Sequence, residues 1–256
     1  MKKTKRVPYF RTIRPVRSGG RKPDELRPLR FTRGFTEFAQ GSVLMELGRT
    51  RVLCTAMVAD GVPPFLYGSG QGWLTAEYAM LPSATPGSRK TRDGRGSRTD
   101  GRSVEIQRLL GRALRSVVDL KAFPDRTIWV DCDVLQADGG TRVASITGAS
   151  VALYDAFLEL DRRGILARWP LRARVAGISV GLVGGEIYLD LDYAEDSGAE
   201  ADMNVVLTEE GEYVEIQGGA EKRPLPPAEL ESMLEVARRG CERLFEAQAQ
   251  VLGLTQ

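Results

Sequence analysis

The stretch 127–148 constrains the fold most strongly, because it joins an apolar strand to a helix through two adjacent glycines. Residues 127–135 form an apolar run that is typical of a strand, and small residues at helical spacing follow Arg142. Gly139 and Gly140 lie at the junction, where they permit a sharp change in backbone direction. The sequence therefore predicts a strand-to-helix unit whose helix continues to about residue 160.

This junction also has the chemistry of an anion-binding site. The first turn of a helix has backbone N–H groups without internal partners and a partial positive charge, so it attracts phosphate. Thr141 adds a hydroxyl, and Arg142 adds a forked and permanently charged donor. An ordinary tight turn is the alternative interpretation, and only other parts of the chain distinguish the two.

Histidine is absent from all 256 residues. This excludes Ser-His and Cys-His nucleophiles, zinc bound by histidine, and acid–base catalysis by histidine. The three cysteines lie far apart and mostly in apolar runs, which indicates buried thiols rather than disulfides or a metal site. Any catalysis must therefore use carboxylates, arginines, lysines, hydroxyls and metal ions.

Hydropathy and charge predict the location of the protein and the kind of partner that it binds. We expect a cytoplasmic protein without a membrane partner, because no run suits a membrane span and no apolar stretch follows the basic N-terminus. Outside residues 1–22 the chain has 27 basic and 34 acidic residues, a net charge of −7. A basic arm on an acidic body suggests a polyanionic partner, although a solvated tail has the same composition. Residues 1–22 contain nine basic side chains and no acidic one, namely Lys2, Lys3, Lys5, Arg6, Arg11, Arg14, Arg17, Arg21 and Lys22.

Residues 87–102 form a polar loop with six basic residues and two aspartates. Arginines spaced by glycines can follow a nucleic-acid backbone, so we predict RNA contacts here, with plain disorder as the alternative. Arg102 ends the loop where a helix begins, with Ser103 available as its cap. A cation at that position opposes the helix dipole unless an anion binds beside it. The predicted RNA-binding residues are Arg89, Arg92, Arg95 and Arg98.

Strand patterns occupy both halves of the chain. The runs 29–35, 42–47 and 51–58 predict an antiparallel meander, and 70–78 predicts a further strand. After a connector at 162–172, the second half repeats the pattern. Its runs are 175–183, 186–192, 203–208 and 212–217, followed by a helix from Pro227. Each half therefore has strands followed by a helix, which indicates an old duplication.

An acidic segment, 190–204, lies between the two predicted hairpins and contains six carboxylates. Asp196 and Asp202 flank a short connector, so we expect both to face one point from neighbouring strand ends. Carboxylates without histidine or thiolate ligands suit Mg²⁺ or Mn²⁺, and one of them could transfer a proton. An acidic loop that serves only solubility is the alternative.

Four motifs together resemble bacterial RNase PH. They are GWLTAEYAMLP at 72–82, GRSVEIQRL at 101–109, CDVLQADGGTR at 132–142, and the acidic residues of 195–205. The resemblance extends from about residue 20 to the C-terminus. It implies an α/β (α+β) fold, ribosomal protein S5 domain 2-like, in duplicated halves at 23–163 and 164–256 after the basic N-terminal arm 1–22.

The resemblance also implies a function. RNase PH is a phosphorolytic 3′→5′ exoribonuclease that trims tRNA precursors and works as a homohexamer, a trimer of dimers. Matched residue by residue, its phosphate site falls on Arg102, Gly140, Thr141 and Arg142. Its metal and acid–base carboxylates fall on Asp196 and Asp202, with Mg²⁺ or Mn²⁺ as the cofactor and inorganic phosphate as co-substrate.

Two alternatives to this function remain open. A catalytically silent, RNA-guiding subunit of an exosome-like ring would have the same fold, although it would not need both the phosphate and the carboxylate residues. A metal-dependent hydrolase would use water in place of phosphate. The released nucleotide distinguishes these possibilities.

Overall fold

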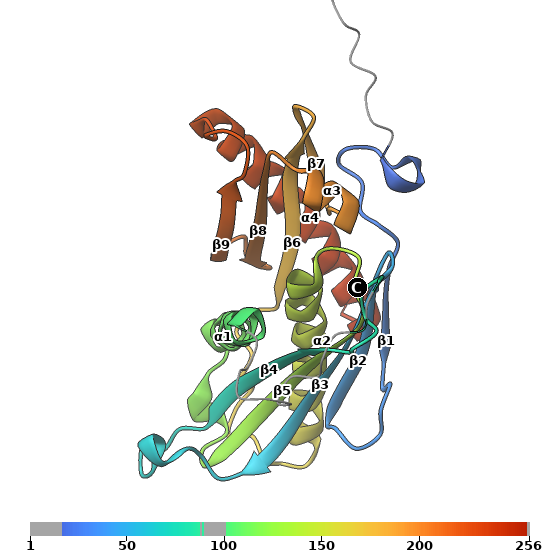
Figure 1. The fold of residues 1–256 in the computed structure, drawn as a ribbon. Helices are drawn as coiled ribbons and strands as arrows, with labels where there is room; N and C mark the ends of the chain where they lie inside the picture. The colour runs from blue at the N-terminus through green and yellow to red at the C-terminus, as the bar shows by residue number, and fades with distance from the viewer. Residues whose placement is uncertain (1–16, 88, 90–100, 255–256) are drawn as a thin grey trace, which may run out of the picture.

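The computed structural model describes residues 17–87, 89 and 101–254, and they form two β-sheets with helices packed on them (Figure 1). The first sheet has the order β1-β2-β3-β5-β4, and the second has the order β7-β6-β8-β9. The strands of the first sheet are β1 (Leu29–Arg33), β2 (Gly41–Leu47), β3 (Thr50–Asp60), β4 (Trp73–Met80) and β5 (Arg126–Gln136). Those of the second are β6 (Val175–Val183), β7 (Glu186–Leu189), β8 (Ala201–Thr208) and β9 (Tyr213–Ala220).

The first sheet confirms the predicted meander, because β1, β2 and β3 pair antiparallel in sequence. β4 and β5 pair in parallel, and α1 (Gly101–Ser116) lies between them in the chain. Alternate residues of β5 point inward, with Val130 and Val134 buried and Trp129 and Asp133 exposed. The sheet is therefore covered on one face, as period-two burial requires.

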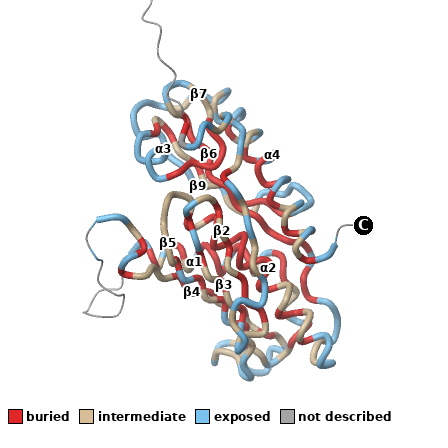
Figure 2. The backbone as a smooth tube through the Cα atoms, turned by 90° about the vertical axis from the view of Figure 1, so that its right-hand side faces the viewer, coloured by how far each residue is buried: buried red, intermediate tan, exposed pale blue. Residues whose placement is uncertain are grey.

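Helix α2 (Thr141–Arg162) is the central element and packs on both sheets, against β2, β3 and β6. Figure 2 shows buried residues, in red, along this helix and along the neighbouring strands β2 and β3. A Cβ added to Gly148 would approach the Cys54 sulfur to 2.7 Å. The close packing at this position compensates for the cost of a glycine in the middle of the helix.

The second half is smaller and has its own core. β6 and β7 form the predicted hairpin, and β8 and β9 pair antiparallel beside it. Helix α4 (Pro227–Leu252) covers this sheet with buried Met233, Ala237, Cys241 and Leu244. The two-domain arrangement is the ribosomal protein S5 domain 2-like fold, as the sequence predicts.

Some local predictions were wrong. Strand β7 ends at Leu189, because Asp190 has a left-handed backbone with φ of 56°, and a short helix, α3 (Tyr193–Gly198), follows in place of an irregular connector. Asp192 caps α3 and forms a capping box with Glu195. Ser103 is not a cap, because α1 already begins at Gly101 and Ser103 is buried inside its first turn. Three short 3-10 turns complete the described chain, at Ser18–Gly20, Pro64–Leu66 and Leu120–Ala122.

The prediction that no run of the chain is long and apolar enough to span a membrane was wrong on length and composition. By length and composition, α2 is apolar enough to cross one. However, 78% of its most apolar window is buried inside the protein, where it contacts both sheets. This apolar character is that of a core helix.

Candidate phosphate and metal site

The glycine junction (residues 138–142) joins β5 to α2 as predicted. Gly139 and Gly140 have φ of 79° and 67°, and Gly140 occupies the N-cap position of α2. The buried hydroxyl of Thr50 donates to the Gly139 carbonyl at 2.7 Å and accepts from the Asp138 N–H at 3.0 Å. The carbonyl side of the junction is therefore fixed by the protein, while the first N–H groups of α2 lack partners within the helix.

Thr141 begins α2 and is buried. Its hydroxyl shares a 2.9 Å hydrogen bond with the phenol of Tyr78 on β4. Burial raises the pKa of Tyr78, and the bond to Thr141 and the charges of Arg102 and Arg142 partly oppose that rise. Tyr78 thus links β4 to the junction, a role that the sequence did not reveal.

Arg142 is the second residue of α2, and its guanidinium contacts two other elements. It donates to Glu105 on α1 at 3.1 Å and to the side-chain oxygen of Gln217 on β9. Gln217 in turn donates to Glu105 at 2.6 Å. The Gln217 bond, followed by the charges of Arg142 and Arg102, lowers the pKa of Glu105. Glu105 therefore balances the two arginines where an anion is expected to bind.

Arg102 lies at the start of α1 and is exposed. Its charge acts on Tyr78, Glu105 and Asp196, which places it at the same site as Arg142. Of the predicted RNA-binding residues, Arg89 is described and exposed. Arg92, Arg95 and Arg98 lie outside the described residues.

Asp196 and Asp202 come from different types of element, because Asp196 lies on α3 and Asp202 on β8. Burial and then the charge of Asp202 raise the pKa of Asp196, against the charges of Arg102, Arg142 and Arg27. Burial and then the charge of Glu221 raise the pKa of Asp202, against Arg142. The two carboxylates and the two arginines are thus close enough to influence one another. The predicted residues come together, although Asp196 reaches the site from a helix and not from a strand end.

The donor set suits a hydrated divalent ion. In the part of the chain that the structure describes, no group of three or more histidine, cysteine, aspartate or glutamate residues is arranged to bind a metal. Two carboxylates fit Mg²⁺, which keeps several waters and takes further oxygens from substrate phosphates. A cation beside Asp196 and Asp202 would also favour their ionised forms, against the burial that is the main cause of both raised pKa values.

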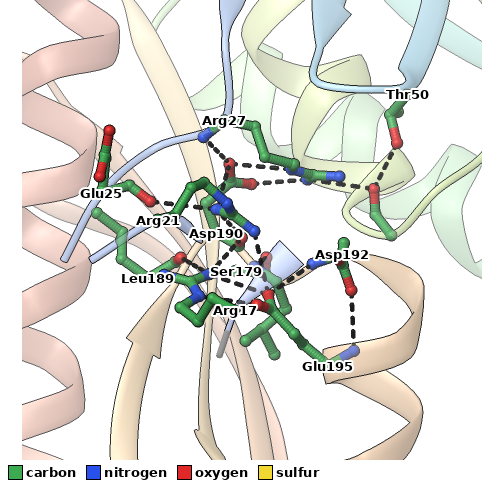
Figure 3. Close-up of polar contacts among 12 residues, drawn as sticks. Arg17, Arg21, Glu25, Arg27, Thr50, Ser179, Leu189, Asp190, Asp192 and Glu195 are labelled. Carbon is green, nitrogen blue, oxygen red and sulfur yellow. Dashed lines mark hydrogen bonds and ion pairs between the residues drawn. The ribbon is translucent and has the colours of Figure 1, made fainter. Parts of the chain in front are cut away.

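A second set of charged residues was missed by the sequence analysis. We define the arginine cluster as Arg17, Arg21, Arg27, Asp190 and Glu195, which are packed together beside α3 (Figure 3). The predicted basic arm, 1–22, lies mostly outside the described residues. Of its cations, Arg17 and Arg21 are in ion pairs with Glu195 rather than exposed to a polyanion.

Comparison with known proteins places this fold in one class, the two-domain 3′ exoribonucleases. Residues 25–159 match the RNase PH model described as "3′ exoribonuclease family, domain 1", and residues 173–240 match "domain 2". The chain therefore belongs to the RNase PH family of 3′ exoribonucleases.

Two solved structures have the same fold. The crystal structure of Rrp46 from rice (Oryza sativa) is 21% identical with a TM-score of 0.74, over 92% of this chain and 100% of that chain. A structure of the Archaeoglobus fulgidus exosome with RNA bound to the active site is 23% identical with a TM-score of 0.75, over 91% of this chain and 92% of that chain.

Proposed function

We propose that this protein is a phosphorolytic 3′→5′ exoribonuclease that trims the 3′ ends of tRNA precursors. Inorganic phosphate attacks the phosphorus of the terminal phosphodiester and displaces the 3′ oxygen of the shortened RNA. The terminal nucleotide, now joined to the attacking phosphate, is released as a nucleoside diphosphate. Run in reverse, the same reaction adds nucleotides. The observation that best supports this proposal is the convergence of Arg102 and Arg142 on Asp196, whose pKa is raised by burial and by Asp202.

The reaction brings a phosphate dianion to a phosphodiester anion, so the site must offset repulsion and align the reacting oxygens. Arg102, Arg142 and the N-terminus of α2 would hold the attacking phosphate. Asp196 and Asp202 would hold Mg²⁺ or Mn²⁺, which stabilises negative charge as it builds up on the transferred phosphoryl group. A carboxyl group with a raised pKa is also suited to give a proton to the departing 3′ oxygen. No covalent intermediate with the enzyme is needed.

The partners are part of the same proposal. Arg89, Arg92, Arg95 and Arg98 would contact the RNA backbone, and the Archaeoglobus fulgidus exosome offers a related fold with RNA bound. Assembly as a homohexamer, a trimer of dimers, follows from the family resemblance. A cytoplasmic location suits the three buried free cysteines.

The test is to incubate the protein with Mg²⁺ and a tRNA that has a short 3′ extension, with and without inorganic phosphate, and to identify the product. Nucleoside diphosphate that forms only with phosphate is the expected result. Nucleoside monophosphate formed in both reactions would replace the proposal with a hydrolase.

The second candidate is a silent RNA-guiding subunit of an exosome-like ring, and the likeness to an exosome structure favours it. Such a subunit would bind RNA and release no nucleotide in either reaction. The presence of arginines and carboxylates at one site argues for activity, because a silent subunit needs neither the phosphate residues nor the metal residues.

A further inference from the structure

Arg27 connects the glycine junction to the segment that leads into α3 (Figure 3). Its guanidinium donates to the carbonyl of Asp138 at 2.5 Å and to that of Gly139 at 3.4 Å. The same guanidinium forms a two-pronged pair with Asp190, at 3.0 Å from Nε and 2.7 Å from Nη2. The N–H of Arg27 also donates to Asp190, at 2.7 Å. One buried side chain therefore contacts both sides of the candidate site.

Asp190 is fully buried and lies at the bend between β7 and α3. Its N–H donates to the Ser179 carbonyl at 2.7 Å, and the next N–H, of Leu191, donates to the Ser179 hydroxyl at 3.0 Å. A Cβ added to Gly139 would approach the Leu191 carbonyl to 2.6 Å. The glycine junction and the entry to α3 are thus in direct backbone contact, with no room for a side chain between them.

The first turn of α3 is fixed from its other side. The carboxylate of Glu195 accepts from Arg17 at 2.8 and 2.9 Å and from Arg21 at 3.2 Å. It also accepts from the N–H of Asp192, while Asp192 accepts from the N–H of Glu195. Asp196, the candidate metal ligand, is the next residue. Its placement therefore depends on the arginine cluster.

We propose that Arg27, with Asp190, is a positioning residue that sets the geometry between the phosphate-binding junction and Asp196. Arg27 would contact neither phosphate nor metal and would act by holding two backbone segments in register. The inference rests on the proposed phosphorolytic function. A planar guanidinium can bond to Asp190 and to two carbonyls at once, whereas a lysine ammonium cannot reproduce that geometry.

The experiment compares Arg27→Lys with a matched control, Arg33→Lys. Arg33 also forms a two-pronged pair with Asp155, from Nε and from Nη2, and it also donates to a backbone carbonyl, that of Val251 at 2.8 Å. Asp155 lies about 20 Å from Arg142 along α2, so the control removes similar chemistry far from the site. Both variants are studied as the full chain, at a temperature where circular dichroism shows each to be folded.

Two quantities are measured, namely hydrogen exchange of the hydrogen-bonded amides of Asp138, Asp190 and Leu191 and the KM for inorganic phosphate at saturating RNA. We expect Arg27→Lys to speed the exchange and to raise the phosphate KM about tenfold or more, with a smaller change in kcat per folded molecule. Arg33→Lys should leave both quantities unchanged. A purely structural role would reduce the amount of folded enzyme without moving KM.

Wild-type exchange and wild-type phosphate KM in Arg27→Lys would overturn the inference and leave the proposed function standing. If the wild-type protein releases no nucleoside diphosphate, the proposed function fails, and the exchange comparison still decides whether Arg27 positions the junction. Arg142→Ala is the reference for a direct phosphate contact, with an expected rise in phosphate KM and intact RNA binding. If Arg27→Lys does not fold, Asp190→Asn is measured in its place.

Discussion

The arginine cluster and the candidate site use the same residue types on neighbouring elements, yet they differ in how their charges are balanced. In the cluster, each oxygen of Asp190 and of Glu195 accepts from an arginine. In the candidate site, Asp196 and Asp202 retain raised pKa values despite nearby arginines, because burial and neighbouring carboxylates outweigh the favourable charges. In the cluster arginines balance every carboxylate oxygen, whereas in the candidate site the arginines do not bring the carboxylate pKa values back to their ordinary range.

Glu195 and Asp196 show this difference within two residues. Consecutive helical residues point about 100° apart, so α3 can direct one carboxylate to the arginine cluster and the next to the site. The first carboxylate stabilises the fold through paired contacts. The second is left in an unfavourable electrostatic environment that a divalent cation would relieve. Similar composition therefore gives fully paired carboxylates in one region and carboxylates with raised pKa values in the other.

The largest expected effect is on catalysis by Asp202→Asn. Loss of one carboxylate from the proposed metal site should lower kcat by about a thousandfold, roughly 4 kcal/mol, without unfolding the protein. Asp131→Asn is the matched control, since burial and then Glu77 and Asp133 also raise the pKa of Asp131, on the outer face of the first sheet. Metal-dependent turnover at the wild-type rate in Asp202→Asn would remove its assigned role.

The same type of substitution in the arginine cluster should affect stability instead. Asp190→Asn leaves Arg27 buried without its charged partner, so we expect the free energy of unfolding to fall by about 3 kcal/mol. Urea denaturation measures this loss. Asp155→Asn, which breaks the more exposed pair with Arg33, should cost no more than about 1 kcal/mol. Equal losses in the two variants would mean that the pair of Arg27 with Asp190 stabilises the protein no more than an exposed ion pair does.

Local patterns predicted most of the fold and the composition of the site. The strand-to-helix junction at Gly139 and Gly140, the meander and both hairpins follow from hydrophobic period and turn residues. Helix α3 also had a local signal, the spacing of Asp192 and Glu195 as a capping box, but the segment was interpreted as a strand end and connector.

The missed contacts have no local signal. Arg27 pairs with Asp190, and Arg17 pairs with Glu195, across more than a hundred and sixty residues of chain. Gln217 on β9 meets Glu105 on α1 only because the two halves pack together. In a sequence, a buried arginine that positions a loop looks the same as a solvated arginine in a basic arm. Only the fold shows that Arg17 and Arg21 pair with Glu195.

The smallest expected effect is the change in the free energy of unfolding caused by Asp196→Asn. Its sign is opposite to that of the change caused by Asp190→Asn. Because the folded pKa of Asp196 lies above its ordinary 3.8, ionisation disfavours the fold as pH rises from that value through the folded pKa. Without metal at pH 7, Asp196→Asn should therefore raise the free energy of unfolding. The gain should be at most about 0.5 kcal/mol, because Asp196 as a whole residue remains exposed to water even though nearby protein atoms partly desolvate its carboxylate.

Mg²⁺ should reverse the order of stability of the wild-type protein and Asp196→Asn. It binds the ionised carboxylates, so the rise in Tm that it causes in the wild-type protein should be largest near pH 7 and decline as protons compete at lower pH. Thermal unfolding with and without Mg²⁺ should show that rise reduced in Asp196→Asn and intact in Asp131→Asn, although burial and neighbouring carboxylates also raise the pKa of Asp131. An equal response to Mg²⁺ in all three proteins would show that Asp196 does not bind the ion, and the contrast with the arginine cluster would then reflect electrostatic strain without a ligand.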